Sequence, residues 1–564
     1  MDNIPGRHLS LFKRFRAIAK PFWVSTLRWK AFALLGGVIA LLVGATVLNV
    51  VNAFVMGKFT TAMQAQDVHG FYKYIALYAA VIIGGTPIMV YYGYLRTKLA
   101  LVWRSWLTAD LTSKYLSKLA YYKLAGDPEI DNPDERITQD VDTFCNMTVG
   151  LSISVCDALF TIFSFAGVLW SMSIPLTFGV VLYALLGSFV SIWIGKKLIP
   201  LNFQHVKAEA DLRYSVADVR RDFESIAFYR GERRVKLQIL RQLSIAMRNL
   251  TGIMNVNRNM GFFTHGYYSL VPIIPLAIAA PLYFAHHMEF GDLTKASVAF
   301  GSIFAGMSLL VSQFGALSAF AANITRLGSF IEALEKYSAP AVKGARVIEL
   351  LPADYLAAEA VDVLTPDASR TLVHELNFRV DPGSSLMIMG PSGAGKSSVL
   401  RALAGIWTVG TGKVYRPDPG ETMFLPQRPH VPSSTLRAAL CYPRTMTCAT
   451  DSHLLALLKL VRLDELAERY GLESEQNWRD VISLGQQQKL SFARLLLHRP
   501  KYAILDEATS ALDEESERHL YEQLKATGST LVSVGHRAGL LVHHERLLTI
   551  SGDGGSWTLT ENKL

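Results

Sequence analysis

The chain has 564 residues, of which 50% are hydrophobic and 18% charged, and its mean hydropathy is +0.24. This length predicts more than one domain, and the hydropathy is high for a soluble enzyme. The net charge of +9 does not indicate a nucleic-acid partner, because much of the basic excess flanks long apolar runs, where the positive-inside rule accounts for it. The four cysteines form no C-x-x-C pair and are expected to be reduced thiols.

The first 325 residues contain six apolar runs that are long enough to cross a lipid bilayer. These runs are 31–55, 72–95, 148–171, 174–195, 262–285 and 296–322. Only a few residues separate the third run from the fourth, which predicts a tight helical hairpin near Ser173. The basic N-terminus is expected to stay in the cytoplasm, and six crossings return the chain there. We therefore expect an all-α membrane domain with six spans over residues 1–335.

Two long charged segments, 96–147 and 196–261, connect the predicted spans on the cytoplasmic side and look like extensions of the membrane helices. The segments on the other side, 56–71 and 286–295, are too short to form a ligand-capturing domain. In the first cytoplasmic segment, Asp131-Asn132-Pro133-Asp134 predicts the start of a short helix, because proline fits the first turn and acidic residues favour a helix N-terminus. A solvated turn is the alternative.

Polar residues inside the spans indicate where a solute could pass. They fall into three sets at helical spacing, namely Ser154, Asp157, Thr161 and Ser164, then Asn49 and Asn52, then His265 and Ser269. An ionised Asp157 facing lipid is costly, so we expect it to face a cavity or a partner. For the asparagine and serine sets, helix–helix hydrogen bonding is an equal alternative. Such a lining suits a hydrophilic solute better than a lipid.

Residues 336–358 lose membrane character and read as a linker, and 359–564 alternate apolar β-type runs with helical ones, as in an α/β nucleotide-binding domain. A phosphate-binding loop stands between an apolar strand at 386–389 and a helix start; it consists of Gly390, Pro391, Ser392, Gly393, Ala394, Gly395, Lys396 and Ser397, with Ser398 next. Glycines let backbone N–H groups approach phosphate oxygens. Lys396 is expected at the β- and γ-phosphates of ATP, and Ser397 at Mg²⁺.

An Asp-Glu pair follows the apolar strand predicted at 502–505. Asp506 is placed to bind Mg²⁺, and Glu507 is the candidate general base that polarises the attacking water. A solvated turn is the usual role of such a pair, but the upstream phosphate-binding loop favours the catalytic interpretation. His536 follows another predicted strand at 530–534 and is the second catalytic candidate.

These motifs resemble those of ABC transporters over nearly the whole chain. The resemblance implies that Gln427 contacts Mg²⁺, that His536 contacts the γ-phosphate and that Asp513 belongs to the loop joining two ATP sites. It also implies that the signature segment containing Ser483, Gly485 and Gln486 closes on the ATP held by a second chain. One copy of each motif therefore implies a homodimer of half-transporters.

Two residues depart from the family pattern. Leu484 stands where the signature has its first glycine, and no aromatic residue for adenine stacking is found around Val363–Pro366. Both departures, together with the Leu425–Pro429 segment, resemble the peroxisomal fatty-acyl half-transporters and their bacterial relatives. Further segments, with Trp103–Thr108 among them, look closest to bacterial BacA-related transporters that carry a fused ATPase. This resemblance implies uptake of peptides or cobalamin across the bacterial inner membrane, with a fatty-acyl substrate as the alternative.

Two other classes of protein also use such a loop. A nucleotide-gated channel or sensor binds ATP with little turnover, but it has no need for Glu507 and His536. A membrane-tethered kinase has no use for a signature segment that acts on another chain. An ATP-hydrolysing transporter is therefore the favoured interpretation, whereas the direction of transport and the substrate are not readable from the sequence.

Overall fold

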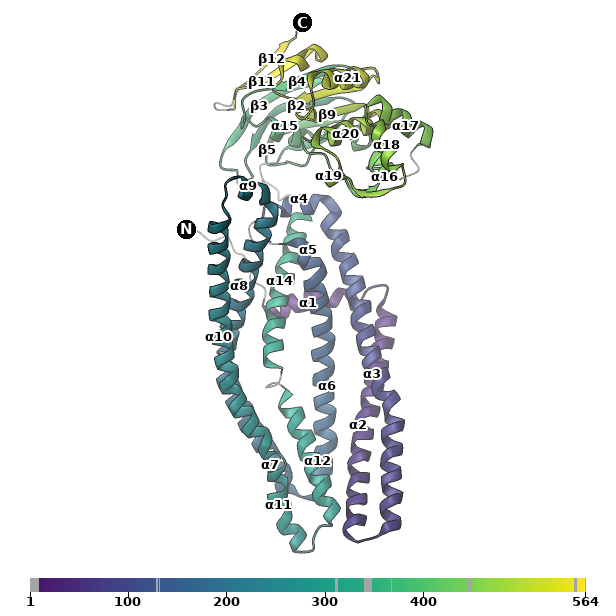
Figure 1. The fold of residues 1–564 in the computed structure, drawn as a ribbon, viewed down its shortest axis with the longest axis vertical. Coiled ribbons are helices and arrows are strands. Elements are labelled where there is room, and N and C mark those ends of the chain that lie inside the picture. Colours follow the sequence, from purple (N-terminus) through teal and green to yellow (C-terminus); the bar gives the residue numbers. More distant parts are fainter. Residues whose placement is uncertain are drawn as a thin grey trace. The chain divides into compact units, whose positions relative to one another are not determined.

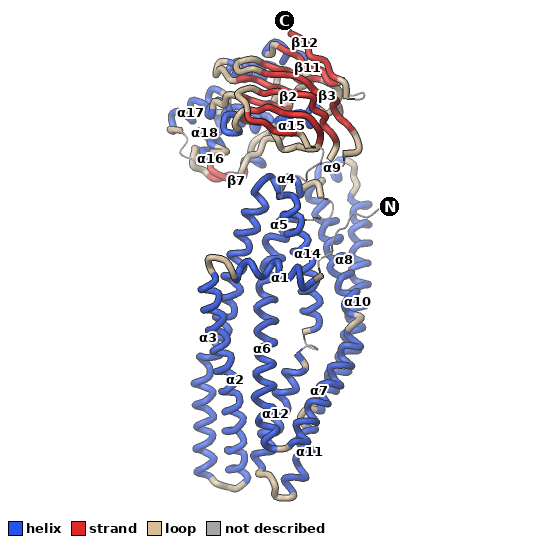
Figure 2. Tube along the Cα trace, turned by 180° about the vertical axis from the view of Figure 1, so that it is seen from behind, coloured by secondary structure: helices blue, strands red, loops and turns tan. Residues whose placement is uncertain are grey.

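The computed structural model describes residues 10–127, 130, 132–309, 313–338, 347–366, 368–444, 449–551 and 555–562. The chain divides into two compact units, Met1–Ala339 and Pro340–Leu564. The described part of the first unit consists of helices, and the second unit holds the strands, drawn in red in Figure 2. Strand β1 (Glu349–Pro352) lies inside the segment that was expected to be a linker.

Long helices make up the first unit (Figure 1). They are α1 (Leu11–Trp23), α2 (Arg28–Gln64), α3 (Val68–Leu116), α4 (Ala120–Leu124), α5 (Pro133–Glu135), α6 (Val141–Met172), α7 (Ile174–Gly195), α8 (Leu198–Arg221), α9 (Phe223–Phe228), α10 (Glu232–Leu270), α11 (Ile273–Phe284), α12 (Phe290–Met307) and α14 (Phe314–Ser338). Short turns, η1 (Ser117–Leu119) and η2 (Arg136–Asp140), adjoin α4 and α6. Helices α8 and α10 pack side by side and are joined through the short α9.

The helices match the predicted spans in all but one case. Among the described residues, five stretches of helix are long and apolar enough to cross a membrane, and they contain the first four predicted spans and all but the last residue of the fifth. The third and fourth spans are separated by the single extended residue Ser173, which confirms the tight hairpin. The sixth predicted span falls on α12, α14 and on residues 310–312, which lie outside the described part, so it stays a prediction. Helix α3 runs unbroken from its span to Leu116, as expected for a helical extension.

The Asn132–Asp134 motif begins a helix, as predicted, with Pro133 in its first turn; Asp131 lies outside the described residues. The helix continues through η2 directly into α6, so it is the start of a membrane helix and not an isolated loop-tip element. Arg326 of α14 pairs with Asp140 at 3.0 Å and with Glu135 at 3.4 Å. Buried Arg136 donates to the Arg326 carbonyl oxygen at 2.6 Å. Each of these charges has an opposite partner or an acceptor, which is what burial of charge requires.

The second unit contains three sheets. Its strands are β1 (Glu349–Pro352), β2 (Leu356–Leu364), β3 (Thr371–Val380), β4 (Ser385–Met389), β5 (Gly410–Arg416), β6 (Thr422–Leu425), β7 (Ser433–Thr435), β8 (Glu475–Asn477), β9 (Tyr502–Asp506), β10 (Thr530–Val534), β11 (Arg546–Ile550) and β12 (Trp557–Glu561). The central sheet has the order β12-β11-β4-β10-β9-β6, a smaller sheet has the order β1-β5-β2-β3, and β7 pairs with β8. All pairings in the central sheet are parallel except that of β11 with β12.

The parallel register places three loops at one edge of the central sheet. Strands β4, β9 and β10 are nearly continuous buried apolar runs, as expected for strands covered on both faces. Val534 pairs with Asp506 on one side of β10 and with Ile388 across β4. The carboxyl ends of these strands therefore lie next to one another, and such edges are where α/β sheets bind ligands.

Helices cover the sheets of the second unit. They are α15 (Lys396–Leu403), α16 (Leu436–Cys441), α17 (Asp451–Leu460), α18 (Asp464–Tyr470), α19 (Trp478–Val481), α20 (Leu484–His498) and α21 (Glu514–Lys525), with the turns η3 (Pro419–Glu421) and η4 (Ala538–His543). Cys145 and Cys156 are free, whereas buried Cys441 is disulfide-bonded. The expectation of reduced thiols is thus wrong for Cys441, because pairing depends on proximity in the fold, which sequence spacing does not give.

Candidate functional site

The loop between β4 and α15 is shaped by glycines that no larger residue could replace without strain. Gly393 and Gly395 have φ values of +81° and +95°. A Cβ atom on Gly390 would lie 2.2 Å from the carbonyl oxygen of Ile550, so the loop backbone runs directly against β11. The loop leads into the N-terminus of α15, where free backbone N–H groups and the helix dipole favour an anion.

Lys396 lies inside this loop and is buried, with 6% of its surface exposed. Its Nζ donates to the carbonyl oxygens of Gly390 and Pro391, both at 2.9 Å. Burial lowers the pKa of Lys396, and the charges of Glu507 and Asp506 act in the opposite direction. The ammonium group is therefore held against the loop itself, where phosphate oxygens would replace the two carbonyls as its acceptors.

Ser397 and Asp506 meet although 109 positions separate them in the chain. The Ser397 Oγ donates to Asp506 Oδ1 at 3.2 Å. Burial raises the pKa of Asp506, while the hydrogen bond from Ser397 lowers it. One hydroxyl and one carboxylate oxygen fit Mg²⁺, which takes few protein ligands and completes its shell with water and phosphate oxygens. The described residues contain no cluster of three His, Cys, Asp or Glu side chains that could hold a metal alone.

Glu507 is the centre of the polar contacts at the sheet edge. Its Oε2 accepts a hydrogen bond from Gln427 Nε2 at 2.9 Å, and its Oε1 lies 3.2 Å from His536 Nε2. The backbone of Glu507 is left-handed, with φ of +47°, and its N–H donates to the Val534 carbonyl oxygen at 3.0 Å. Such strain in a residue that is not glycine is concentrated at functional sites. The structure thus brings both candidate catalytic residues and Gln427 into contact.

The signature segment begins α20, and a capping box explains its local structure. The Ser483 Oγ accepts from the Gln486 backbone N–H at 3.3 Å, and the Gln486 Oε1 accepts from the Ser483 N–H at 3.0 Å. Gln486, expected to bind nucleotide, therefore has its side-chain oxygen engaged within its own helix turn. A Cβ on Gly485 would lie 3.0 Å from the Ala511 carbonyl oxygen. The signature turn thus packs against the segment that precedes Asp513.

Among the described residues, no hydrogen bond or ion pair links this signature segment to the phosphate-binding loop of the same chain. Asp513 caps the N-terminus of α21, where its carboxylate accepts from the Ser516 N–H at 2.8 Å, and this bond lowers its pKa. Ser398 lies on α15 next to Ser397. Ser483, Gly485, Gln486 and Asp513 are therefore not part of the cluster around Glu507, and a role in nucleotide binding for them stays a prediction.

Arg537, which sequence reasoning missed, connects the His536 segment to the loop before α21. It donates to the Leu512 carbonyl oxygen at 2.9 Å and to the Ser510 carbonyl oxygen at 3.3 Å. It also pairs with Glu517, whose carboxylate is buried, at 3.4 Å. A basic residue directly after a candidate histidine was the available signal. Arg537 thus fixes the position of the loop that leads to Asp513.

Gln488 was also missed, and it joins two loops of the site to helix α20. Its side chain is fully buried, at 0% exposure. Its Nε2 donates to the Gln427 carbonyl oxygen and to Ser510 Oγ, both at 3.2 Å, and its Oε1 accepts from the Ala511 N–H at 3.0 Å. The amide therefore ties the Gln427 loop and the Ser510–Ala511 loop to helix α20. A glutamine on the buried face of a helix that starts at a signature motif was the only sequence signal.

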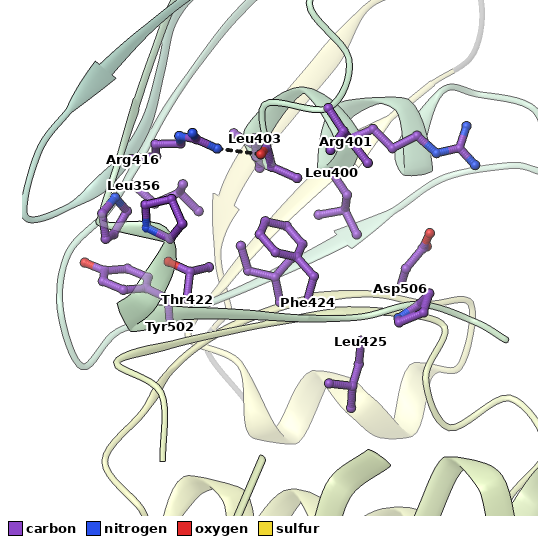
Figure 3. A pocket seen from close by; sticks show the side chains of 16 residues that line it. Leu356, Leu400, Arg401, Leu403, Arg416, Thr422, Phe424, Leu425, Tyr502 and Asp506 are labelled. Atoms are coloured by element: carbon purple, nitrogen blue, oxygen red, sulfur yellow. Dashed lines mark hydrogen bonds between the residues drawn. The ribbon is translucent and has the colours of Figure 1, made fainter. Parts of the chain in front are cut away.

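A separate apolar pocket of about 420 Å³ lies beside α15 (Figure 3). Leu400, Leu403, Phe424 and Tyr502 contribute to its lining, and Asp506 stands at its edge. The Arg416 guanidinium, at its rim, donates to the Ala404 carbonyl oxygen. A largely aliphatic and aromatic wall offers few donors to phosphate oxygens. The glycine loop, and not this pocket, therefore stays the candidate for phosphate binding.

Around the expected adenine position, the residues nearest to the loop are aliphatic. A Cβ on Gly395 would lie 3.3 Å from the Leu372 Cβ and 3.5 Å from Val373 Cγ2 of β3. Trp407 lies against the Val363–Pro366 segment, since its Nε1 donates to the Leu364 carbonyl oxygen at 2.9 Å. The expectation that a stacking aromatic is missing here stays open.

Comparisons with known proteins agree with this geometry. A family model described as ABC transporter transmembrane region 2 matches residues 19–284, and one described as ABC transporter matches residues 373–510. An uncharacterized ABC transporter ATP-binding protein of Synechocystis is 41% identical over 93% of this chain and 81% of its own length. The chloroplastic ABC transporter D family member 2 of Arabidopsis thaliana is 35% identical, over 96% and 86%.

The human lysosomal cobalamin transporter ABCD4 is 30% identical, over 99% of this chain and 98% of its own length. Among solved structures, a bacterial Atm1-family ABC exporter with ATP bound is similar, with a TM-score of 0.74 at 17% identity over 93% of this chain and 94% of that one. This likeness concerns the fold. The predicted fold class, an exporter-like helical membrane domain with an α/β P-loop domain, is confirmed.

Proposed function

The chain belongs to the ABC transporter family, and we propose that it forms a homodimer in the bacterial inner membrane that hydrolyses ATP to take up a hydrophilic solute such as cobalamin or a peptide. The observation that carries the proposal is the contact of Glu507 with both Gln427 and His536, beside the glycine loop. A site that only binds nucleotide has no need for a carboxylate positioned in this way. The presence of an ATPase and of membrane helices in one chain supports transport as the proposed function.

The residues divide the chemistry among them. The glycine loop and Lys396 would hold the phosphates of ATP, and Ser397 with Asp506 would hold Mg²⁺, which supplies charge neutralisation when bound. Glu507 is placed to accept a proton from the attacking water as general base. Gln427 and His536 hold its two carboxylate oxygens in place. In the resemblance to ABC transporters, His536 would also contact the transferred phosphoryl group.

The second copy would complete each site. Ser483 has its hydroxyl at the N-terminus of α20, where free N–H groups favour an anion. We infer that this end faces the γ-phosphate held by the other chain. The loop that leads to Asp513, which the Arg537 contacts hold in place, would then connect the two sites. Each ATP would in this way join the two chains.

The solute is the least constrained part. One relative is by name a cobalamin transporter, and others are by name only ABC transporters. Polar side chains within the helices of the first unit favour a hydrophilic solute over a fatty-acyl one. Uptake across the inner membrane follows from the resemblance to bacterial BacA-related transporters.

Reconstitution into liposomes tests the proposal. The wild-type protein is expected to hydrolyse ATP with Mg²⁺ and to drive uptake of labelled cobalamin or labelled peptide, measured in vesicles of both orientations. The Glu507→Gln variant is expected to bind ATP yet lose most turnover, because binding needs the loop and cleavage needs a polarised water. Tight ATP binding without measurable wild-type hydrolysis would instead indicate a nucleotide-gated channel or sensor.

A further inference from the structure

Two sets of polar side chains that are far apart in the sequence meet in one pocket of the first unit. The pocket has a volume of about 450 Å³, which is within the usual range for small-molecule sites. Helices α2, α6 and α12 supply its polar residues, which are Asn49, Asn52, Ser154, Asp157, Thr161 and Ser302. Ser164, His265 and Ser269 are absent from this lining. The pocket thus joins the Asp157 face of α6 to the asparagine face of α2.

Close helix packing defines the pocket. A Cβ on Gly306 of α12 would lie 3.2 Å from the Ala158 carbonyl oxygen of α6. A Cβ on Gly291 would lie 2.0 Å from the Gly57 carbonyl oxygen of α2. The three helix backbones therefore approach as closely as glycine permits, and the side chains of the pocket are carried on rigid elements.

The pocket presents hydrogen-bond acceptors that the protein does not fill. Within the described part of the chain, the Asp157 carboxylate forms no ion pair within 4.0 Å and no hydrogen bond, and Arg96 of α3 is the basic group whose charge acts on it. Asn52 Oδ1 is buried without a hydrogen-bond partner. A buried acceptor without a donor is costly. The Asp157 carboxylate is exposed on the single chain, and a charge inside a membrane helix is costly until it is paired. Both costs fall when a donor-bearing cation enters.

The apolar part of the lining complements a particular shape. Met56, Phe165, Val298 and Leu309 share the pocket with the polar residues. A lysine or arginine side chain has a long apolar stem with a charged end. Its stem would contact these four residues while its head reaches the acceptors of α2 and α6. A carboxylate or phosphate group would meet Asp157 with repulsion.

We propose that this pocket binds a positively charged group, an ammonium or a guanidinium on an apolar stem, of the transported solute. The inference rests on the proposed function as a transporter and specifies its substrate class: it favours a basic peptide over cobalamin. Asp157 supplies the charge-assisted hydrogen bond, which is roughly twice as strong as a neutral one. The Asn52 oxygen supplies the second acceptor for the same head group.

Binding of model peptides to the full-length protein tests this without ATP. Trilysine, triglutamine and triglutamate are titrated by calorimetry into protein in lipid nanodiscs. Wild-type protein is expected to bind trilysine at least tenfold more tightly than the other two peptides. Asp157→Asn is expected to lose that tenfold preference, and Asp157→Glu to keep it. Asp142→Asn, on the same helix but outside the pocket and paired with Arg104 at 3.0 Å, is the matched control and is expected to keep it too.

Every other result overturns the inference. Equal trilysine affinity in wild type and Asp157→Asn removes the carboxylate from the site, and triglutamate or triglutamine binding as tightly as trilysine removes the charge preference. Absence of trilysine binding to the wild type does the same. Melting temperatures of the variants show whether each is folded. If Asp157→Asn melts early, the peptide preference of Asp157→Glu decides the test. Loss of ATP hydrolysis by the wild type would contradict the proposed function alone, since this binding assay uses no ATP.

Discussion

Gln488→Leu removes the amide that joins the loops of the ATP site while keeping a side chain of similar length. Three hydrogen bonds disappear, to the Gln427 carbonyl oxygen, to Ser510 Oγ and to the Ala511 N–H. A net contribution of about 0.5–1.5 kcal/mol for each gives about 1.5–4.5 kcal/mol in total. The groups that lose their bond to Gln488 are near the surface and can form hydrogen bonds with water instead. We therefore expect a total loss of about 2 kcal/mol.

The effect is expected in turnover more than in nucleotide affinity. The hydrogen bonds of the Gln488 side chain go to segments other than the glycine loop, so the KM for ATP should change less than threefold. If the lost energy falls on the transition state, kcat drops by about 30-fold, since about 1.4 kcal/mol corresponds to tenfold. The assay is steady-state ATP hydrolysis of the full-length protein in liposomes, with ATP affinity measured separately by equilibrium binding.

Ser529→Ala provides the control for stability. Ser529 is buried and donates to the Pro500 carbonyl oxygen at 2.6 Å, at the end of β10 that is opposite to His536. Its loss should lower the melting temperature without changing kcat. A Gln488→Leu protein with wild-type kcat, or one that loses activity only in proportion to its melting temperature as Ser529→Ala does, would refute a positioning role for this amide.

Three further outcomes are expected. Lys396→Ala should weaken Mg·ATP binding at least tenfold in equilibrium titrations, because it removes the charge that faces the phosphates; unchanged affinity would contradict this role. Arg537→Ala should lower kcat about tenfold and Arg537→Lys less, since only the guanidinium bonds both Ser510 and Leu512; equal activity of both variants would argue against it. Burial lowers the pKa of His544 from its ordinary value of 6.5 to about 4, so the unfolded chain binds the proton more readily than the folded chain. Stability of the second unit should therefore fall as pH decreases from 6.5 to 4, by about 3 kcal/mol in total. His544→Gln should flatten this dependence in pH-resolved melting of the full chain, and an unchanged slope would exclude His544 as its source.

Local chemistry made most of the ATP site predictable. The glycine loop needs only its own residue types, a preceding strand and a following helix. Asp506, Glu507 and His536 follow buried strands, and parallel strands bring such positions to one edge. The sequence could not predict that Gln427 contacts Glu507, because this contact depends on the pairing of β6 with β9.

Positions that depend on packing between distant segments were not predictable. Gln488 shares its motif with Gln487 and Gln486, and nothing in the sequence distinguishes the one that binds two other loops. Periodicity placed Asn49 and Asn52 on one face and Asp157 on another, but not against each other. Periodicity also placed Ser164 on the same helix face as Ser154, although the pocket includes only Ser154. The direction in which α2 and α12 pack on α6 decides these cases.

We propose above all that a second chain completes the ATP site. A protein with cysteines in place of Ser392 and Leu484, with serines at Cys145 and Cys156 and with Glu507→Gln to retain ATP, is oxidised in the presence of Mg·ATP. A covalent dimer of twice the 62.4 kDa chain mass is expected, and it should be absent without nucleotide. Only monomer in the presence of bound ATP, whether cross-linked within the chain or not at all, would contradict the account.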